Sequence, residues 1–535
     1  MKSNACWIIC LLTCAVALPA QPAPANRPDR LEWFQDQGFG MFIHWSMDGQ
    51  LGVVISHSMA GASGDYLKRY VEELPRTFNP EKFNPRAWAR LAKVAGMKYV
   101  MFTTKHHSGF CMFDTATTDF SVMNTPFKRD ILAEVVKAFR EQGIAIGFYF
   151  SADDFHWLYA HGKMIDRRPE LMPPSQPELL AYARTQLKEL MSNYGRVDLM
   201  FFDGQSKGLT DYVWSLAPDL VITSGGMKTT EQHIAGTPSV EPFEACFTMG
   251  QEWNYRPTND PYKTAAQMIG MLIETRARGG NLLLNVGPTP DGEIPLEQEN
   301  RLREMALWNF INGEAIYGVR PWVVTNEGNY WFTKKKDAGT VYVAVREPWK
   351  YTERKEIRLA SVRATAATEV SVLGQSGELI EYQPQVDART TWKQEAGGLH
   401  IRAVRAQRLY TSGFWPNPVV LKITNVKPAL ESPKVATGGW KWDSTSGVTT
   451  LAGELVDLAG AASLEVGLQY RSLKGQDTNE RTLPWVSTPF VRRSVPGFFS
   501  VTVKGLEAGE AYEYRAVVKH PLLSVYGEER RVVLK

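Results

Sequence analysis

Short apolar runs alternate with longer amphipathic stretches from about Leu31 to Tyr317. The apolar runs predict strands at Gly38 to Trp45, Lys98 to Thr104, Ile144 to Phe150, Val197 to Gly204, Leu220 to Thr223 and Asn281 to Pro288. The amphipathic stretches predict helices at Pro85 to Ala95, Ile131 to Gln142, Pro177 to Tyr194, Thr264 to Arg278 and Leu296 to Asn312. Alternation of this kind over roughly 290 residues predicts an α/β fold of the (β/α)8-barrel type, spanning residues 27–317. Fewer than eight clean strand–helix pairs are visible, which indicates an irregular barrel.

The run Val197 to Gly204, VDLMFFDG, carries the most informative single residue. Its apolar residues suit a strand buried on both faces, as in a parallel sheet. Asp203 follows them, and a charge at that position is costly unless another group pairs with it or uses it. Because catalytic residues collect at the carboxyl ends of barrel strands, Asp203 is the first candidate for a chemical role.

Helical periodicity stops after Tyr317, and short β-rich runs separated by turn residues take its place. They predict a β-sandwich over residues 318–412, followed by a linker at Ser412 to Asn417 and a second β domain over residues 418–535. The stretch Leu506 to Val517, LEAGEAYEYRAV, resembles the late part of a fibronectin type III module. That short resemblance carries no chemistry.

Composition and charge narrow the class of protein. The 535 residues are 44% hydrophobic and 22% charged, which is typical of a soluble globular chain with sizeable cores. The formal net charge of +3 is small for this length, so it favours neither nucleic acid nor an anionic membrane as a partner.

The N-terminal residues 1–20 predict a cleaved signal peptide. Lys2 provides a positive start, Trp7 to Val16 an apolar core, and Ala15 to Ala17 a small-residue cleavage site. A membrane span is disfavoured because the apolar run is shorter than the roughly 20 residues required. A lipoprotein signal is also disfavoured, because Thr13 is unusual before Cys14. The expected location is secreted or periplasmic.

Two cysteines, Cys111 and Cys246, lie beyond the predicted signal peptide. Two cysteines provide neither a disulfide framework nor a convincing metal set. Buried free thiols are the favoured interpretation, and a single bridge between them stays open as the alternative.

Polar and aromatic residues follow several of the predicted strands directly. They include His44 and Trp45 after one strand, His106 and His107 after the next, and Asp203 after a later one. On a parallel barrel these strand ends share one rim. The histidine spacing matches no zinc motif, so no metal site is predicted. Imidazoles that hydrogen-bond to hydroxyl groups and aromatic faces that pack on a pyranose ring favour a sugar.

Cleavage of a glycosidic bond normally requires a second carboxyl group. The segment Glu241 to Tyr255, EPFEACFTMGQEWNY, offers Glu241, Glu244 and Glu252 among apolar and aromatic neighbours. Such surroundings raise the pKa of a carboxyl group, as a general acid requires. Spacing alone does not choose among the three, and the alternative for each is a solvated charge on a loop.

These motifs together resemble the α-L-fucosidases, family 29 of the glycoside hydrolases. The resemblance rests on FGMFIHW (Phe39 to Trp45), FTTKHHSGFCMFDT (Phe102 to Thr115), PFKRDI (Pro126 to Ile131), GFYFS (Gly147 to Ser151), VDLMFFDG, FEACFTMGQEWNY (Phe243 to Tyr255) and GGNLLLNVGPTPDGEIP (Gly279 to Pro295). It covers the barrel in order and extends through the first β-sandwich, while the C-terminal module lies outside it.

The resemblance implies a retaining exo-glycosidase that removes terminal α-L-fucose from a fucosylated oligosaccharide or glycoconjugate, without metal or cofactor. By motif, Asp203 corresponds to the nucleophile and Glu244 to the acid/base, with Glu252 as second and Glu241 as third choice. His44, His106 and His107 correspond to residues that bind fucose hydroxyls, and Trp253 to a residue that lines the sugar site. We also place Trp45, which follows His44, among the substrate-binding candidates.

The chain departs from the family pattern at several positions around the predicted rim. Ser108 and Ser46 stand where aspartate and glycine are usual, and the loop from Met47 to Ala62 does not follow the usual sequence. Phe150 and Asn254 replace a common tyrosine and a common glycine. Two alternatives therefore stay open: a related L-sugar glycosidase, such as an α-L-galactosidase, and a non-catalytic carbohydrate-binding protein on the same barrel.

Overall fold

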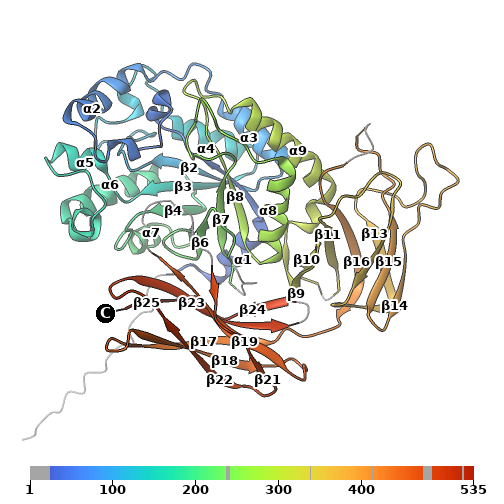
Figure 1. Ribbon diagram of the computed structural model, residues 1–535. Helices are drawn as coiled ribbons and strands as arrows, with labels where there is room; N and C mark the ends of the chain where they lie inside the picture. Colours follow the sequence, from blue (N-terminus) through green and yellow to red (C-terminus); the bar gives the residue numbers. More distant parts are fainter. Residues whose placement is uncertain are drawn as a thin grey trace, which may run out of the picture.

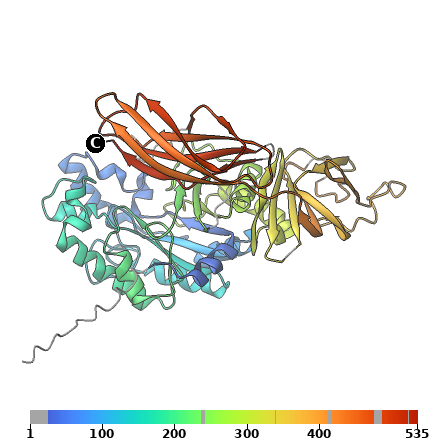
Figure 2. The ribbon, with the colours of Figure 1, turned by 90° about the horizontal axis from the view of Figure 1, so that it is seen from below.

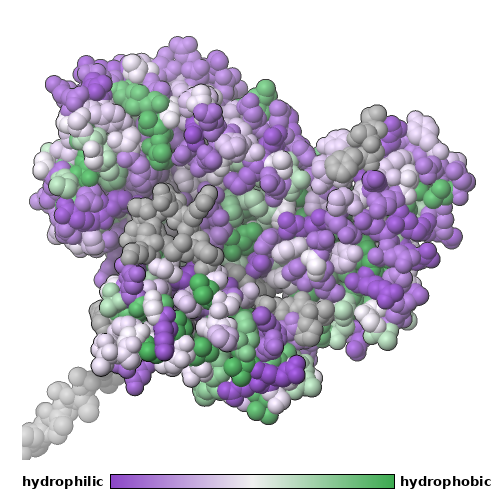
Figure 3. All heavy atoms as spheres, in the orientation of Figure 1, coloured by the Kyte–Doolittle hydropathy of each residue, from purple (hydrophilic) through white to green (hydrophobic). Residues whose placement is uncertain are grey.

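The computed structural model describes residues 25–235, 241–337, 339–410, 415–473, 485–520 and 523–534. The predicted signal peptide lies outside these ranges. Among the helices within them, none is long and apolar enough to cross a membrane. Figure 3 shows a face on which hydrophilic residues predominate and apolar ones are scattered, in keeping with the composition.

A barrel-like sheet of eight parallel strands forms the first domain, as predicted (Figure 1). Its strands are β1 (Phe39–Ile43), β2 (Tyr99–Lys105), β3 (Ala145–Ser151), β4 (Leu199–Asp203), β5 (Val221–Ile222), β6 (Thr229–Glu231), β7 (Glu244–Thr248) and β8 (Asn281–Val286). They pair in the order β5-β4-β3-β2-β1-β8-β7-β6. In the described residues β5 and β6 are therefore the two ends of the sheet, and the barrel is open between them.

Helices surround this sheet and connect its strands. They are α1 (Pro28–Gln37), α2 (Gly64–Lys68), α3 (Pro85–Ala95), α4 (Ile131–Glu141), α5 (Phe155–Ala160), α6 (Pro177–Asn193), α7 (Thr210–Leu216), α8 (Ala265–Ala277) and α9 (Leu296–Asn312). The five predicted helices match α3, α4, α6, α8 and α9 to within one residue at each end.

Local chemistry explains why these boundaries could be read from the sequence. The side chain of Asn84 accepts a hydrogen bond from the backbone N–H of Ala87 at the start of α3, which is a standard N-cap. Gly96 ends the same helix with a φ of 89°, and a Cβ at this position would come within 2.4 Å of the Tyr317 hydroxyl oxygen. Only glycine satisfies both the left-handed conformation and the close approach.

The parallel register brings the carboxyl ends of the strands to one rim. Ile43 of β1 pairs with Phe102 of β2, and Ser151 of β3 pairs with Asp203 of β4. Every residue of β2 is buried, as expected for a strand covered on both faces. The loops that follow β1, β2, β3 and β4 therefore emerge together and can build one site.

Two short strands, β6 and β7, differ from the prediction. The segment Glu241 to Tyr255 is predicted as a rim loop, whereas its residues Glu244–Thr248 form β7 within the sheet. Both strands are brief, three and five residues, and they lack the long apolar runs that reveal the other strands. This difference moves Glu244 to the first residue of a strand, which is the end opposite the rim that carries Asp203.

The second domain is the predicted β-sandwich. It contains β9 (Val319–Glu327), β10 (Tyr330–Lys335), β11 (Val341–Val345), β12 (Arg354–Leu359), β13 (Val362–Val372), β14 (Thr391–Glu395), β15 (Gly398–Val404) and β16 (Val419–Pro428). Its sheets have the orders β13-β16-β11-β10-β9 and β12-β15-β14. Because β16 pairs with both β11 and β13, the domain ends beyond the predicted boundary at 412–418.

The third domain is a second β-sandwich. It contains β17 (Lys434–Asp443), β18 (Val448–Asp457), β19 (Leu464–Ser472), β20 (Val486–Ser487), β21 (Val491–Arg493), β22 (Gly497–Lys504), β23 (Ala511–His520), β24 (Leu523–Tyr526) and β25 (Arg530–Val533). One sheet is β17-β18-β22, and the other is built on β19 and β23. Figures 1 and 2 show this orange-to-red sandwich lying against the barrel on the side of β6.

A buried arginine holds the amino-terminal end of the barrel together. Arg276 of α8 is 1% exposed, and its guanidinium donates to the backbone oxygens of Gly280, Gln35 and Ile316 and to Asn281 Oδ1. Burial lowers its pKa to about 10, so the group stays charged at neutral pH. One side chain thereby satisfies carbonyl oxygens from α1, from the turn before β8 and from the turn after α9.

We expect Arg276→Met to destabilise the barrel by at least about 3 kcal/mol, because several buried acceptors lose their donor at once. Differential scanning calorimetry of the full chain measures this as a lower Tm of the barrel transition. Arg303→Met is the control, since Arg303 is exposed and pairs only along α9 with Glu299. Equal effects of the two substitutions would contradict the role of Arg276.

Candidate active site

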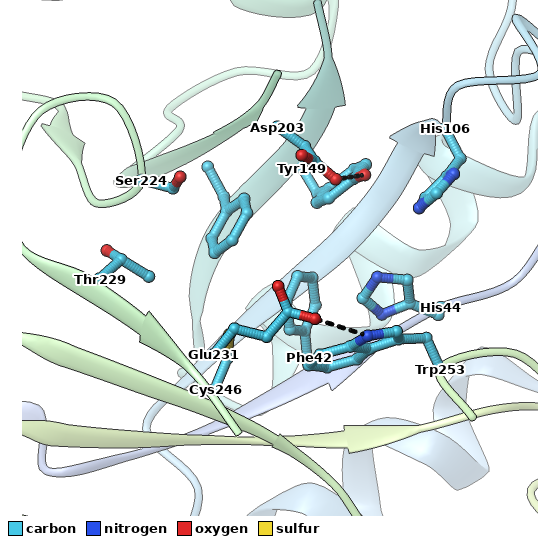
Figure 4. Close-up of a pocket in the computed structure, with 11 residues that line it drawn as sticks. Phe42, His44, His106, Tyr149, Asp203, Ser224, Thr229, Glu231, Cys246 and Trp253 are labelled. Carbon is cyan, nitrogen blue, oxygen red and sulfur yellow. Dashed lines mark hydrogen bonds between the residues drawn. The ribbon is translucent and has the colours of Figure 1, made fainter. Parts of the chain in front are cut away.

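A small cavity opens at the carboxyl ends of the barrel strands (Figure 4). It is lined by Phe42, His44, His106, Tyr149, Phe201, Asp203, Ser224, Thr229, Glu231, Cys246 and Trp253. Its volume of about 110 Å³ is well below the roughly 300–1,000 Å³ of pockets for drug-sized ligands. A cavity of this size suits one monosaccharide unit and not an internal stretch of a longer chain.

Asp203 enters the cavity from the end of β4. Its Oδ2 accepts a hydrogen bond of 2.6 Å from the Tyr149 hydroxyl and lies 3.2 Å from His107 Nε2. Its Oδ1 lies 3.7 Å from Arg167 Nη2. The side chain of Asp203 is 34% exposed, so the carboxylate is fixed by three protein groups and still faces the cavity.

These neighbours keep Asp203 ionised. Burial on its own raises the pKa of Asp203, but the charge and hydrogen bond of His107, followed by His106 and Arg167, outweigh it. The pKa of Asp203 therefore lies well below its ordinary value. An ionised carboxylate with a fixed orientation at the mouth of a cavity is what a nucleophile requires.

Arg167 is held against Asp203 by a buried partner. Its Nε donates to Asp153 Oδ2 at 2.8 Å, and Asp153 is fully buried directly after β3. Asp153 also lies 3.5 Å from His107 Nδ1 through the same oxygen. Asp153 thus contacts both His107 and Arg167, the two residues whose nitrogen atoms face Asp203. Arg167 was absent from the sequence-based candidates because it lies in a loop with no recognisable motif.

His44 is buried and uncharged, and its surroundings fix its tautomer. The amide nitrogen of Asn285 donates to the Trp253 carbonyl, so Asn285 Oδ1 must be the acceptor that lies 2.7 Å from His44 Nδ1. His44 Nδ1 therefore carries the proton, and its Nε2 is left as an acceptor. Burial lowers the pKa of His44 to about 4, so it remains neutral over the physiological range. A neutral imidazole can accept a hydrogen bond from a sugar hydroxyl.

The paired histidines lie side by side and have different surroundings. His106 stacks on the Tyr149 ring at 5.2 Å, and its Nδ1 lies 3.0 Å from Ser56 Oγ. Burial lowers the pKa of His106 well below its ordinary value. His107 Nδ1 donates to Ser151 Oγ, since the Ser151 hydroxyl itself donates to a backbone carbonyl. His106 therefore faces the cavity, whereas His107 contacts Asp203.

The unusual loop from Met47 to Ala62 folds into this site. Ser56 has a φ of 62°, and its backbone N–H donates to the buried carboxyl group of Asp48 at 2.6 Å. The Tyr70 hydroxyl also donates to Asp48. The next residue, His57, places its ring 5.3 Å from that of His107. The residues that depart from the family sequence thus form a packed structure. This structure places Ser56 and His57 beside His106 and His107.

Glu231 is the second carboxyl group of the cavity, and the sequence-based candidates did not include it. It is the last residue of β6, and Trp253 Nε1 donates to its Oε1 at 3.0 Å. Figure 4 shows Glu231 and Asp203 entering the cavity from opposite sides. Burial and the charge of Asp203 raise the pKa of Glu231 to about 7, against a smaller opposing effect of Trp253. Glu231 can therefore hold a proton near neutral pH.

Glu244, the sequence-based choice for the acid/base, does not line this cavity. It is the first residue of β7, fully buried, and accepts a hydrogen bond of 2.8 Å from the hydroxyl of Tyr99, the first residue of β2. Burial raises its pKa to about 7 as well, so the pKa does not distinguish it from Glu231. Their positions distinguish the two glutamates, because Glu244 lies at the amino-terminal end of the strands, whereas Asp203 lies at the carboxyl end.

The other candidates are also distributed unevenly. Glu252 lies 3.9 Å from Arg256 in the loop after β7, and Glu241 is exposed, and neither lines the cavity. Trp45 is fully buried beneath the rim, where its Nε1 donates to the Thr289 carbonyl and its ring packs on Trp88. Trp45 is therefore a core residue. Asp203, His44, His106 and Trp253 line the cavity, and His107 contacts Asp203.

The two cysteines outside residues 1–24 are free thiols and both are buried. Cys246 is one of the residues that line the cavity, and burial raises its pKa well above its ordinary value. A neutral thiol contributes a small apolar surface there and no nucleophile at physiological pH.

Within the described residues, one group of side chains has ligand atoms close enough for a metal ion. His106, His107 and Asp203 have nitrogen and oxygen atoms within 4.8 Å of one another. His107 and Asp203 already face each other, and the cationic Arg167 lies 3.7 Å from the same carboxylate. The donor set therefore suits a substrate with hydroxyl groups better than a resident cation, because the protein already supplies positive charge.

The fold and the cavity define a class. An ionised carboxylate, a second carboxyl group whose pKa is raised to about 7, buried histidines and aromatic walls at the carboxyl ends of barrel strands are typical of the active site of a glycoside hydrolase.

Comparisons with known proteins establish the family. A family model described as Alpha-L-fucosidase matches residues 20–314. The tissue alpha-L-fucosidase of Bos taurus is 30% identical over 401 residues, which cover 67% of this chain and 81% of the bovine protein. The plasma alpha-L-fucosidase of Rattus norvegicus is 28% identical and covers 67% of this chain and 84% of the rat protein.

Solved structures agree with the sequences. Alpha-L-fucosidase isoenzyme 1 from Paenibacillus thiaminolyticus matches with a TM-score of 0.60 and 27% identity, covering 74% of this chain and 99% of that chain. The alpha-fucosidase of Thermotoga maritima, solved in complex with fucose, matches with a TM-score of 0.58 and 25% identity, covering 75% and 97%. The chain belongs to the α-L-fucosidase family, family 29 of the glycoside hydrolases, and is an enzyme of that class.

We expect Arg167→Met to raise the pKa of Asp203, because a positive charge near the carboxylate is lost. The acidic limb of kcat/KM against pH, measured with an aryl α-L-fucoside, should move to higher pH by about one unit. Arg167→Lys, which keeps the charge, should shift it less.

Arg168→Met is the matched control, since Arg168 pairs with Asp166 and Glu170 outside the cavity. An acidic limb that stays in place in Arg167→Met, or that moves equally in Arg168→Met, would contradict the role of Arg167.

Proposed function

We propose that this enzyme is a retaining exo-α-L-fucosidase that removes terminal fucose from fucosylated glycans by double displacement. In the first step the Asp203 carboxylate attacks the anomeric carbon, and Glu231 gives its proton to the departing glycosidic oxygen. A covalent fucosyl–Asp203 ester forms and the aglycone leaves as an alcohol. In the second step Glu231 takes a proton from water, the resulting hydroxide attacks the anomeric carbon, and Asp203 departs as a carboxylate.

The opposed ionisation of the two carboxyl groups carries this assignment. The pKa of Asp203 is held well below its ordinary value, while that of Glu231 is raised to about 7 by burial and by the charge of Asp203. Two carboxyl groups whose pKa values are driven apart in one cavity are typical of a nucleophile and an acid/base. Formation of the ester removes the charge of Asp203, which lowers the pKa of Glu231 and suits it to act as a base in the second step.

The walls of the cavity support fucose over its close analogues. Fucose carries a methyl group at C5 where L-galactose carries CH2OH. Phe42, Phe201 and Cys246 provide an apolar wall, each at most 8% exposed. His44 and His106 provide neutral imidazoles for the ring hydroxyls. An apolar wall favours the methyl group by about 1–3 kcal/mol.

We also propose that the protein is exported. The support is the sequence of residues 1–20, in which a positively charged start precedes an apolar core and a small-residue cleavage site. Export would place the enzyme where complex glycans are encountered.

Replacement of the nucleophile provides the first test. Asp203→Gly should lower kcat for an aryl α-L-fucoside by at least about four orders of magnitude, because no covalent intermediate can form. Added azide should partly restore turnover in this variant and yield the β-configured fucosyl azide, the product of direct displacement. Full activity of Asp203→Gly, or an α-configured azide product, would contradict the assignment of Asp203.

Replacement of the acid/base separates Glu231 from Glu244. Glu231→Gln should slow hydrolysis of a fucoside with a poor leaving group, such as the 4-methylphenyl fucoside, by about 100- to 10,000-fold. It should affect the first step much less with 2,4-dinitrophenolate, which leaves without protonation. The wild-type kcat/KM should fall above a pH of about 7, and this limb should disappear in Glu231→Gln.

Glu244→Gln is the matched control, because burial raises the pKa of its carboxyl group to about 7 as well, but the group lies at the other end of the strands. It should keep the alkaline limb and show no dependence on the leaving group. The reverse pattern, with Glu244→Gln sensitive to the leaving group and Glu231→Gln insensitive, would restore Glu244 as the acid/base.

A further inference from the structure

The strand that carries Glu231 has little support from the barrel itself. β6 has three residues and lies at one end of the sheet, where its pairing partner among the described strands is β7. Short edge strands with hydrogen bonds on one side belong to the less stable parts of a fold. An acid/base must nevertheless be held within a fraction of an ångström of the glycosidic oxygen.

The turn after β6 is also strained. Gln232 has a φ of 54°, a left-handed conformation that costs a non-glycine residue about 1 kcal/mol or more. Local hydrogen bonds maintain this turn, since His233 Nδ1 lies 2.9 Å from the Glu231 carbonyl and the Thr230 hydroxyl donates to the His233 carbonyl. A strained turn next to a functional residue persists only when its surroundings hold it.

The third domain provides such surroundings through an ion pair. Lys228, the residue before β6, donates from Nζ to Glu529 Oε2 at 2.9 Å. The side chain of Glu529 is only 14% exposed, and the charge and hydrogen bond of Lys228 lead the effects that lower its pKa against the effect of burial. The Lys228 side chain is 40% exposed, so the pair is shielded on the side of Glu529 and open to solvent on the side of Lys228.

A second residue of the third domain, Arg515, fixes the side chain of Glu529. Glu529 Oε1 accepts from Arg515 Nη1 at 3.0 Å, and Arg515 also donates to Gln469 Oε1. The guanidinium of Arg515 lies over the rings of Tyr526, at 3.9 Å, and Trp485, at 4.1 Å. Two aromatic faces and two hydrogen-bond acceptors leave Arg515 a single orientation. Glu529 therefore presents a rigid carboxylate to the base of β6.

The electrostatic influence of the third domain extends to the turn. Burial is the main cause that lowers the pKa of His233, and the charges of Arg471, Glu529 and Glu513 also act on it. All three charged residues belong to the third domain, and His233 holds the Glu231 carbonyl. The family match ends at residue 314, so this contact comes from a part of the chain outside it.

We propose that the third domain positions the acid/base: Glu529, backed by Arg515, holds Lys228 and thereby β6, so that Glu231 is aimed at the glycosidic oxygen. Lys228, Glu529 and Arg515 are positioning residues, since none of them lines the cavity. The inference rests on the proposed role of Glu231. It gives the additional domain a part in the protonation of the leaving group.

The test uses the full-length enzyme with Lys228→Met, Glu529→Gln and the double variant. Each should lower kcat/KM, which reports the first step, about tenfold for a fucoside with a poor leaving group and much less for 2,4-dinitrophenyl or fluoride, which need no proton. The double variant should show no further loss beyond either single one, because both break the same contact. Lys228→Arg, which keeps the charge, should retain the wild-type rate.

A second interdomain ion pair of similar geometry is the matched control. Lys422 of the second domain lies 2.7 Å from Glu314 of the barrel, away from β6. Glu314→Gln and Lys422→Met should leave the leaving-group dependence unchanged even where they lower the Tm. This comparison distinguishes a role in positioning Glu231 from a general stabilisation of the contacts between domains.

Two results would overturn the proposal. One is an equal loss of kcat/KM for good and poor leaving groups in Lys228→Met and Glu529→Gln, and the other is no loss at all. If Glu231→Gln itself shows no dependence on the leaving group, the proposed role of Glu231 fails instead. The two failures are therefore distinguishable in the same series of substrates.

Discussion

Two carboxyl groups share one small cavity, and the repulsion between their charges governs the rest of the site. If both were ionised, the cost would be high, so the protein stabilises one charge and not the other. His107 and Arg167 hold the pKa of Asp203 below its ordinary value, whereas burial and the charge of Asp203 raise the pKa of Glu231. The buried Asp153 contributes to this difference, because it contacts both Arg167 and His107 beside Asp203.

The two carboxyl groups come from separate strands of the barrel. β4 carries Asp203 and β6 carries Glu231, and the open edge of the sheet lies between β5 and β6. Asp203 therefore comes from a well-paired strand and Glu231 from the edge of the sheet. A less constrained edge can accept a catalytic group on a strained turn, but it needs external support. The contact between Lys228 and Glu529 is in the right place to give it.

The departures from the family sequence are mutually consistent. Ser46 begins a loop whose buried Asp48 accepts from the Ser56 N–H and from Tyr70, and Ser56 in turn contacts His106. Asn254 lies 3.4 Å from the same Asp48. Residues that look like isolated losses of a motif thus form one hydrogen-bonded structure beside His106 at the cavity. Such a rim is where specificity for the aglycone is expected to reside.

The sequence by itself determined the barrel, five helices, Asp203 and the histidines, because long periodic segments and strand-end residues are encoded locally. It did not determine the second carboxyl group. Glu231 lies on a three-residue strand without an apolar run, and Glu244, in a family-like motif, faces Tyr99 at the opposite end of the barrel. Which glutamate reaches Asp203 depends on strand register and on contacts between residues hundreds of positions apart, such as Lys228 and Glu529, and only the tertiary structure decides these.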